Sequence, residues 1–227
     1  MMRRLCVLLA VGVLTAFCGV SEEDYAKVQS EVKSLRNDLT VTQRKLAEEE
    51  ARSKVVNDRF SFLAQKLRGV KARIKTNFGD METEFFPDKA PLQCFSFITR
   101  AESGFYDGTI FHRVIENFMI QGGDPLSKDD NPANDGTGGP IVSIPHEFND
   151  IKHTKGILST ARADIPSGAG SQFFIMHGTN PGLDGQYTVF GKVTKGLDVV
   201  DKIATTKTGR GDRPVKTVVI QTIEVFR

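Results

Sequence analysis

The sequence predicts a mainly β domain, a closed barrel or sandwich with two helices, which follows a long N-terminal helix and an export signal. Three observations predict this order. The first twenty residues have signal-sequence architecture, residues 22–68 carry a seven-residue apolar repeat, and the apolar period changes to two from Val70 onwards. Composition changes at the same place, because all nine prolines lie at or after Pro87 and no glycine lies between Val20 and Gly69.

The export signal is predicted to comprise residues 1–20. Arg3 and Arg4 form its positive end, and an apolar stretch runs from Leu5 to Phe17. At about 13 residues this stretch is shorter than the roughly 20 that a transmembrane helix needs, so we expect a signal rather than a membrane span or a buried helix. The protein is therefore expected to be exported, to a bacterial cell envelope or beyond it.

Cys18 predicts how the mature chain begins. The segment from Leu14 to Gly19 resembles a bacterial lipobox, in which the cysteine at the cleavage site carries a lipid. It departs from that pattern because Leu14 stands one place too far from the cysteine and Phe17 replaces a small residue. We expect Cys18 to be lipidated and to anchor the protein to a membrane, in the periplasm or on the outer surface. Cleavage near Ser21 would instead release a secreted protein.

Charge and cysteine content restrict the remaining functions. The net charge is +2, and removing Arg3 and Arg4 with the signal leaves a near-neutral chain, which has no electrostatic reason to bind nucleic acid. Beyond the signal and Cys18 the only cysteine is Cys94, so no disulfide framework is expected within the chain. Cys94 is expected to be a small buried residue of a helix.

Residues 21–69 are predicted to form a helical stalk. They are rich in residues that form helices readily or decorate their surfaces. With Tyr25 at heptad position a, ten of the thirteen a and d positions are apolar, which is typical of a helix that can form a coiled coil. At ~1.5 Å per residue the stalk would extend roughly 70 Å, and its seam offers a surface for self-association through residues 22–68. A helix folded back on the domain, or a partly disordered tether, would also fit this pattern.

From residue 70 to 227 the pattern is that of a separate domain made of short strands. Alternation over 70–76 and 81–85, on either side of a turn at 77–80, predicts a hairpin with one buried face. The elements expected after it are a helix between Pro87 and Gly104, short strands up to 189–193, a helix near 197–203 and a last strand over 215–226. Many strands with two lone helices indicate a closed barrel or a sandwich.

Three motif-like segments fail on their spacing. His146–Asp150 begins like a zinc-protease motif but has Asp where the second His ligand belongs. The acidic loop 129–136 does not match an EF-hand and is expected to be a solvated turn. Gly168–Ser171 lacks the nucleophile elbow of a serine hydrolase. We therefore expect no metal site and no hydrolase.

Four segments in a fixed order carry the functional signal. They are Phe111–Ile115 (FHRVI), Phe118–Asp124 (FMIQGGD), Gly170–Ile175 (GSQFFI) and Leu183–Val193 (LDGQYTVFGKV). Their combination resembles the cyclophilin family of peptidyl-prolyl cis/trans isomerases, over residues 70–227. The resemblance implies a closed eight-stranded antiparallel β-barrel capped by two helices, and an enzyme that acts on X-Pro bonds of proline-containing peptides. Together with the export signal, it leads us to expect unfolded exported proteins as substrates.

The chemistry of X-Pro isomerisation requires neither a nucleophile nor a cofactor, and we expect none to be bound. The bond resists rotation by ~18 to 20 kcal/mol because the nitrogen lone pair is shared with the carbonyl. A catalyst needs an apolar slot for the prolyl ring, a donor to the prolyl nitrogen and groups that hold the moving carbonyl. Arg113 is the candidate donor because its guanidinium stays charged and carries fixed N–H groups. The alternative for Arg113 is a salt bridge at the end of a strand.

The resemblance also implies the other site residues. Those implied to be catalytic are Arg113, Phe118 and Gln121. Those implied to bind substrate are Met119, Ala161, Arg162, Ala163, Gln172, Phe174, Leu183 and Tyr187. The apolar members match the family's proline pocket, the two glutamines match residues that orient the substrate or the arginine, and residues 161–163 match a strand whose backbone pairs with the peptide.

The sequence departs from the family at three of its positions. It contains no tryptophan, and Gly182 aligns with the frequent tryptophan at the pocket edge. Tyr187 stands where many members have histidine, and Arg162 where many have asparagine. None of these changes removes the arginine or the pocket, so isomerase activity is still expected. The loss of the tryptophan puts tight binding of cyclosporin in doubt.

Two other functions stay open at this point. The domain could be a module that grips proline-containing partners, with the stalk adding avidity and turnover incidental. It could also be a structural surface lipoprotein that keeps only the fold. The presence of Arg113 favours the enzyme, because a pure binding module has no need of this arginine.

Overall fold

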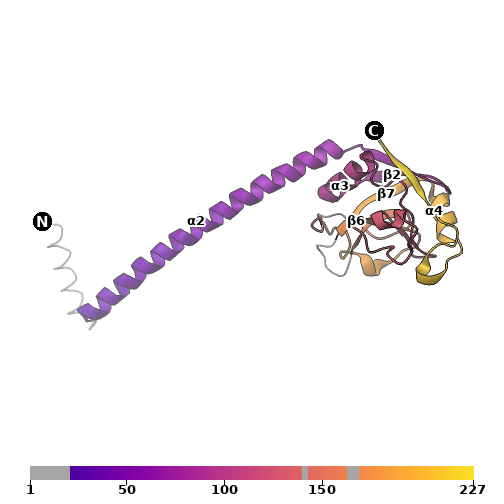
Figure 1. Cartoon of the computed structure of the whole chain (residues 1–227). Helices are drawn as coiled ribbons and strands as arrows, with labels where there is room; N and C mark the ends of the chain where they lie inside the picture. The colour runs from indigo at the N-terminus through magenta and orange to yellow at the C-terminus, as the bar shows by residue number, and fades with distance from the viewer. Residues whose placement is uncertain (1–20, 140–142, 163–168) are drawn as a thin grey trace. The chain divides into compact units, whose positions relative to one another are not determined.

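The computed structural model describes residues 21–139, 143–162 and 169–227, with only the backbone given at positions 162 and 169 (Figure 1). Cys18 and Ala163 therefore lie outside the described residues. By internal contacts the chain divides into two compact units, Met1–Asn57 and Asp58–Arg227.

Helix α2 (Glu22–Leu67) is the long helix predicted for residues 22–68. It begins with a local cap, in which the Ser21 hydroxyl accepts a hydrogen bond from the Asp24 N–H at 3.1 Å and donates to the Asp24 carboxylate at 2.6 Å. Every described side chain from residue 21 to 59 is exposed, including the apolar residues of the heptad seam. In the described part of the chain, no helix combines the length and apolarity that a membrane crossing needs.

The unit Asp58–Arg227 is built on one eight-stranded antiparallel sheet. Its strands are β1 (Lys71–Thr76), β2 (Gly79–Phe85), β3 (Arg113–Ile115), β4 (Met119–Gly122), β5 (Ile157–Arg162), β6 (Ala169–Met176), β7 (Val189–Lys195) and β8 (Ile220–Phe226). They are ordered β3-β4-β6-β5-β7-β2-β1-β8. The predicted hairpin is confirmed as β1 and β2, in which Ile74 faces Met81 across a tight turn.

The sheet is a curled half-barrel, so the closed barrel that the sequence predicted is not confirmed. The edge strands β3 and β8 form no ladder with each other. Close to this edge, Ile110 makes an isolated bridge with Val219, and the Phe111 N–H donates to the Val218 carbonyl at 2.9 Å. Because β3 is only three residues long and these contacts precede it, they do not extend into a continuous ladder.

The last strand is shorter than predicted. It starts at Ile220 instead of residue 215, because the chain after Pro214 first lies against a loop, where the Val215 N–H donates to the Lys207 carbonyl at 2.8 Å. The two predicted helices of the domain are α3 (Pro91–Glu102) and α4 (Leu197–Ala204).

The main core lies between the curled sheet and these helices, and Phe97 of α3 is at its centre. The Phe97 side chain is fully buried, and its ring lies 5.1 to 5.6 Å from those of Phe85, Tyr106, Phe173 and Phe190. Aromatic pairs at such distances add to the free energy of burial. The core of this unit therefore draws residues from strands and helices far apart in the sequence.

The end of α2 also belongs to this unit. Leu67 is buried in the main core, Leu63 packs against it, and the Arg227 guanidinium donates to the Lys66 carbonyl at 2.8 Å. The last turns of the helix are thus held by the sheet unit, in contrast to the exposed residues before them.

Helix α3 contains the free cysteine and has an unusual cap. Cys94 is fully buried with its Sγ 3.3 Å from the Phe190 carbonyl oxygen, and burial raises the pKa of this thiol far above its ordinary value. Ala90, the residue before α3, makes no side-chain hydrogen bond to cap the helix. Instead the Glu147 carboxylate accepts hydrogen bonds from the Leu92 and Gln93 N–H groups at 3.0 and 2.9 Å. The acidic residue of the failed zinc motif is therefore a helix cap supplied from a distant loop.

Candidate active site

Eight of the eleven site residues implied by the sequence line one small hollow. They are Arg113, Phe118, Met119, Gln121, Ala161, Phe174, Leu183 and Tyr187. The hollow has a volume of about 130 Å³. A single water needs only ~10–15 Å³ of such space, so the hollow has room for a ring of five heavy atoms.

The register of three strands brings these residues together. Arg113 of β3 faces Gln121 of β4, and Gln121 faces Phe174 of β6. Directly opposed residues on neighbouring antiparallel strands point to the same side of a sheet. The cation, the amide and the aromatic ring therefore form a row across the sheet, although up to about sixty residues separate them in the sequence.

The hairpin between β3 and β4 is tight enough to fix this row. Its turn includes Asn117 in the left-handed region at φ 59°, which asparagine tolerates better than most residues. The Asn117 N–H donates to His177 Nδ1 at 2.8 Å, and the Phe118 N–H donates to the Ile115 carbonyl at 3.1 Å. Phe118 is thereby held at the rim of the hollow.

A chain of hydrogen bonds orients Gln121. Its Nε2 donates to Gln172 Oε1 at 3.0 Å, and Gln172 Nε2 donates in turn to the carbonyls of Gly136 and Gly138 at 3.0 and 2.7 Å. Gln172 does not line the hollow but links Gln121 to the loop that carries Gly136 and Gly138. The bond to Gln172 uses one of the two N–H donors of the Gln121 amide, so the other N–H and the carbonyl oxygen can meet a bound peptide.

Arg113 is half-exposed and is held at one nitrogen only. Its Nε donates to Asp212 Oδ2 at 3.4 Å, and Asp212 lies in the 3-10 turn η4 (Arg210–Asp212) with φ 60°. The terminal Nη groups have no partner among the described residues. The salt bridge considered as an alternative role for Arg113 is therefore present, and it leaves the ends of the guanidinium to interact with a ligand.

The apolar wall of the hollow is a small hydrophobic cluster separate from the main core. Met119 and Phe174 are buried in it, and Phe118, Leu183 and Tyr187 pack against it. The rings of Phe174 and Tyr187 meet edge to face, with centroids 5.9 Å apart. These five side chains form an apolar lining beside the arginine.

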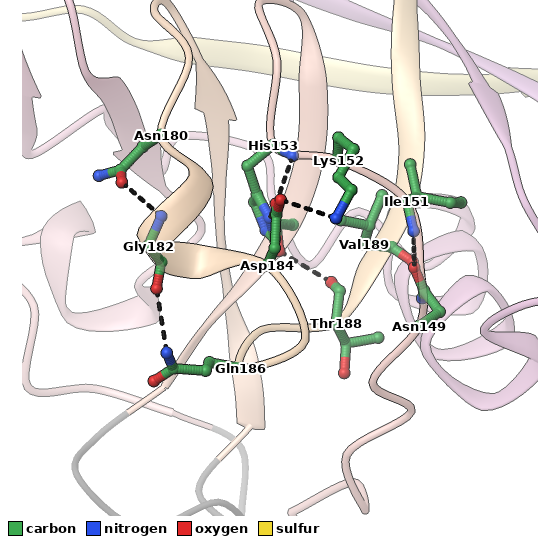
Figure 2. A network of polar contacts seen from close by, with 11 residues as sticks. Asn149, Ile151, Lys152, His153, Asn180, Gly182, Asp184, Gln186, Thr188 and Val189 are labelled. Carbon is green, nitrogen blue, oxygen red and sulfur yellow. Dashed lines mark hydrogen bonds and ion pairs between the residues drawn. The ribbon is translucent and has the colours of Figure 1, made fainter.

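The segment that carries Leu183 and Tyr187 is held by the polar network shown in Figure 2. Asp184 is its centre, because its carboxylate accepts from the His153 N–H at 2.9 Å and lies 3.2 Å from Lys152 Nζ. These contacts lower the pKa of Asp184 to about 2, the His153 backbone N–H having the largest effect. The 3-10 turn η3 (Pro181–Leu183) is thereby tied to the loop before β5.

His153 is the buried partner of Asp184. Its Nδ1 lies 3.1 Å from Asp184 Oδ1 and its Nε2 lies 3.1 Å from the Ser159 hydroxyl. Burial lowers the pKa of His153, and the neighbouring Asp184 only partly offsets this. We infer a neutral imidazole whose Nδ1–H donates to the carboxylate.

Sequence reasoning missed two supporting residues. Neither His153 nor Asp212 lies in a motif segment, and their contacts depend on loops that meet only in the fold. Three implied residues do not line the hollow in the described structure. Gln172 holds the Gln121 amide, Arg162 is described only by its backbone in β5, and Ala163 lies outside the described residues.

Comparison with known proteins places the chain in a family. Residues 71–225 match the family described as cyclophilin type peptidyl-prolyl cis-trans isomerase/CLD. The peptidyl-prolyl cis-trans isomerase CYP18-1 of Arabidopsis thaliana is 43% identical over 159 residues, which are 67% of this chain and 93% of that protein. Peptidyl-prolyl cis-trans isomerase-like 2 of Rhizopus delemar is 39% identical over 182 residues, or 78% of this chain, but the chain spans only 33% of that protein.

A solved structure agrees with these relatives. The crystal structure of a Cryptosporidium parvum cyclophilin type peptidyl-prolyl cis-trans isomerase, determined in the presence of the dipeptide Ala-Pro, is 34% identical with a TM-score of 0.64. The match covers 69% of this chain and 99% of that one. With most of the chain matched in sequence and in fold, the protein belongs to the cyclophilin-type peptidyl-prolyl cis-trans isomerases.

Proposed function

We propose that the chain isomerises X-Pro bonds in the hollow of the curled sheet, and that its substrates are exported or envelope proteins. The observation that carries the catalytic part is the position of Arg113. Its guanidinium lies at the rim of an apolar hollow of about 130 Å³, in one row with Gln121 and Phe174. A relative crystallised with Ala-Pro supports a proline-containing ligand.

The mechanism follows from what each group can do. Burial of the prolyl ring against Phe118, Met119, Phe174 and Leu183 holds one side of the bond, and the carbonyl before it remains able to turn. An Nη group of Arg113 donates to the prolyl nitrogen as its lone pair leaves conjugation, which lowers the ~18 to 20 kcal/mol barrier. The Gln121 carbonyl oxygen accepts from a peptide N–H and keeps the chain in place.

Replacing Arg113 tests this assignment. We expect Arg113→Ala to lower kcat/KM on a short X-Pro peptide at least about tenfold, or ~1.4 kcal/mol of transition-state stabilisation. Arg113→Lys is also expected to be slow, because an ammonium lacks the planar fork of donors. Arg68→Ala is a matched control, since Arg68 pairs with Asp88 at 2.7 Å and does not line the hollow. An unchanged rate in a well-folded Arg113→Ala protein would reject the mechanism.

The place of action is proposed from the N-terminal signal. A positive end followed by a short apolar stretch supports export, and Cys18 supports a lipid anchor at the periplasmic or outer face of a membrane. Metabolic labelling with a clickable fatty acid tests the anchor, with Cys18→Ser as the control. Label that is absent, or that is the same in both proteins, would leave the ordinary secreted form. Fractionation of the native cells tests the localisation itself.

We also propose that α2 pairs with the α2 of a second copy. Its seam residues are exposed, for example Leu35 at 67% and Leu39 at 57%, which leaves an apolar stripe without a described partner. Soluble proteins rarely leave a contiguous apolar stripe of this kind uncovered. A second copy is the occupant that the heptad pattern favours, because the seam is complementary to itself.

Charges favour an antiparallel pair. A parallel pair in register would put Glu49 opposite Glu49 of the second copy, in the middle of the seam, where two like carboxylates are costly. In an antiparallel pair centred between residues 40 and 41, Glu49 lies opposite Val32. Beside the seam, Glu31 then lies near Arg52 of the second copy, and Asp38 near Lys45. Opposite charges at flanking positions set partner orientation in coiled coils.

Cysteine cross-linking tests both the pairing and its direction. In the antiparallel arrangement Leu35 faces Leu46 of the second copy, so a mixture of Leu35→Cys and Leu46→Cys chains starting at Ser21 should form mixed disulfides. Each variant alone should stay uncross-linked, and the buried Cys94 should not interfere. Cross-linking of Leu35→Cys to itself would indicate a parallel pair. Monomers at every concentration in sedimentation analysis would contradict pairing altogether.

The peptide assay also separates this enzyme from the two alternative functions. A proline-binding module would bind the peptide without isomerising it, and a structural surface lipoprotein would do neither. In both cases no turnover that depends on Arg113 would be seen. Pairing of α2 does not affect this test, because the test measures turnover in the hollow. The seam residues of α2 are far from the hollow in sequence and are exposed.

A further inference from the structure

A second and much larger hollow shares two residues with the proline hollow. Its volume is about 910 Å³, and it has Arg113 and Gln121 in common with the smaller one. Its other walls are His112 and residues from the segments 132–137 and 209–215. A peptide whose prolyl ring lies in the small hollow would therefore pass neighbouring residues into the larger one.

The charges of this second hollow are unbalanced toward the positive. Two of its arginines have acidic partners, since Arg113 pairs with Asp212 and Arg213 Nε lies 3.2 Å from Asp135 Oδ2. Arg210 is exposed and makes no hydrogen bond or ion pair with any residue that the structure describes. The hollow thus presents one uncompensated guanidinium toward a bound chain.

We propose that Arg210 selects substrates with an aspartate or glutamate close to the proline, an inference that rests on the proposed isomerase function. Arg210 lies two residues before Asp212, whose carboxylate contacts Arg113. The Arg210 backbone therefore lies at most ~7 Å from the backbone of Asp212. An extended peptide rises ~3.3 Å per residue. The acidic side chain then falls two to four residues from the proline, within reach of a long arginine side chain.

The interaction is a charge-assisted hydrogen bond at a partly solvated site. A guanidinium can bind a carboxylate through two parallel N–H donors, which lysine or glutamine cannot do. Exposed ion pairs contribute little, so the expected preference for acidic peptides is about threefold to fivefold in kcat/KM. Since ions screen exposed charges, the preference should fall as salt is raised.

A peptide series on the purified full chain tests the proposal. Peptides carry Glu, Gln or Lys two, three or four residues before or after one Xaa-Pro bond, and both kcat/KM and affinity by fluorescence anisotropy are measured. For wild type we expect Glu to exceed Gln at one of these positions. Arg210→Gln should abolish the preference, and Arg210→Glu should shift it to Lys. Lys71→Gln, which removes an exposed cation of β1 outside both hollows, should leave it unchanged.

The outcomes separate this inference from the isomerase assignment. Turnover of Gln peptides without any preference for Glu overturns the role of Arg210 alone. That role is equally overturned if Arg210→Gln keeps the wild-type preference, or if Arg210→Glu fails to shift affinity toward Lys. Absence of turnover with every peptide would instead overturn the isomerase, and the anisotropy series would still decide whether Arg210 binds acidic chains. Thermal unfolding confirms that the Arg210 variants, on an exposed loop, remain folded.

Discussion

Helix α2 up to residue 57 and the sheet unit from residue 58 are held by different kinds of contact. The helix uses contacts within a few residues of each other, such as the Ser21–Asp24 cap and the Arg44–Glu48 pair at 3.2 Å. The sheet unit uses contacts between distant residues, such as the Glu147 carboxylate that caps α3 from more than fifty residues away. Isolated helices gain little stability from local contacts, which is consistent with the proposed pairing of the apolar seam of α2.

The same contrast separates burial in the two regions. Leu39 of α2 is 57% exposed, whereas Phe97 of the sheet unit is fully buried among four aromatic rings. An apolar side chain stabilises a fold only by the area it removes from water. The sheet unit is therefore expected to fold by itself, and the seam to contribute only when two chains meet.

The largest expected effect is on the core. Phe97→Ala should lower the free energy of unfolding of the sheet unit by about 3–5 kcal/mol, because it removes a large ring and leaves a cavity. Leu39→Ala should change it by less than about 0.5 kcal/mol in dilute protein. Urea denaturation followed by tyrosine fluorescence measures both. A large effect of Leu39→Ala on the monomer would show that the two regions are not independent.

A smaller effect is expected from the distant cap. Glu147→Ala should destabilise the sheet unit by about 1–2 kcal/mol, because two N–H groups at the start of α3 lose their acceptor. Glu147→Gln keeps one acceptor oxygen and should lose less. Ser21→Ala removes the local cap of α2 and should leave unfolding of the sheet unit unchanged, which makes it the matched control. If Ser21→Ala and Glu147→Ala behave alike, the contrast between local and distant caps is wrong.

The pH dependence of stability gives the finest test. The pKa of Asp184 is about 2 in the folded chain, below the ordinary ~3.9, so the ionised carboxylate stabilises the fold. This contribution is complete above about pH 4–5 and is lost as the pH falls through 4 toward 2. Asp184→Asn should remove that part of the acid sensitivity in urea titrations. Asp58→Asn on α2, an exposed residue with no ion pair in the described chain, should not.

Sequence patterns predicted the parts of this molecule that depend on neighbours along the chain. The period of two located β1 and β2, because alternate residues of one strand face the same side whatever lies opposite. The motif segments also located the hollow, because Arg113, Gln121 and Phe174 fall on three strands whose register aligns them. In the exposed helix the heptads predicted α2 itself.

Contacts between distant loops could not be predicted in the same way. The ion pair of Arg113 with Asp212 joins residues 99 apart, and nothing in either segment indicates the other. The cap of α3 could not be predicted either. Glu147 belongs to a segment that only begins like a zinc-protease motif, and nothing in that segment indicates that its carboxylate caps α3. Closure of the barrel was expected from the family resemblance, but the short β3 and the isolated bridge at Ile110 leave the sheet open.

Because Cys94 is fully buried, its chemical reactivity reports on local opening of this domain. A thiol with no access to solvent cannot exchange with glutathione or react with a maleimide until α3 leaves the sheet. The rate at which a maleimide modifies Cys94 should therefore measure how often α3 transiently separates from the sheet in the native domain. In an oxidising compartment the same shielding would keep the enzyme from being trapped as a mixed disulfide, for as long as that helix stays docked.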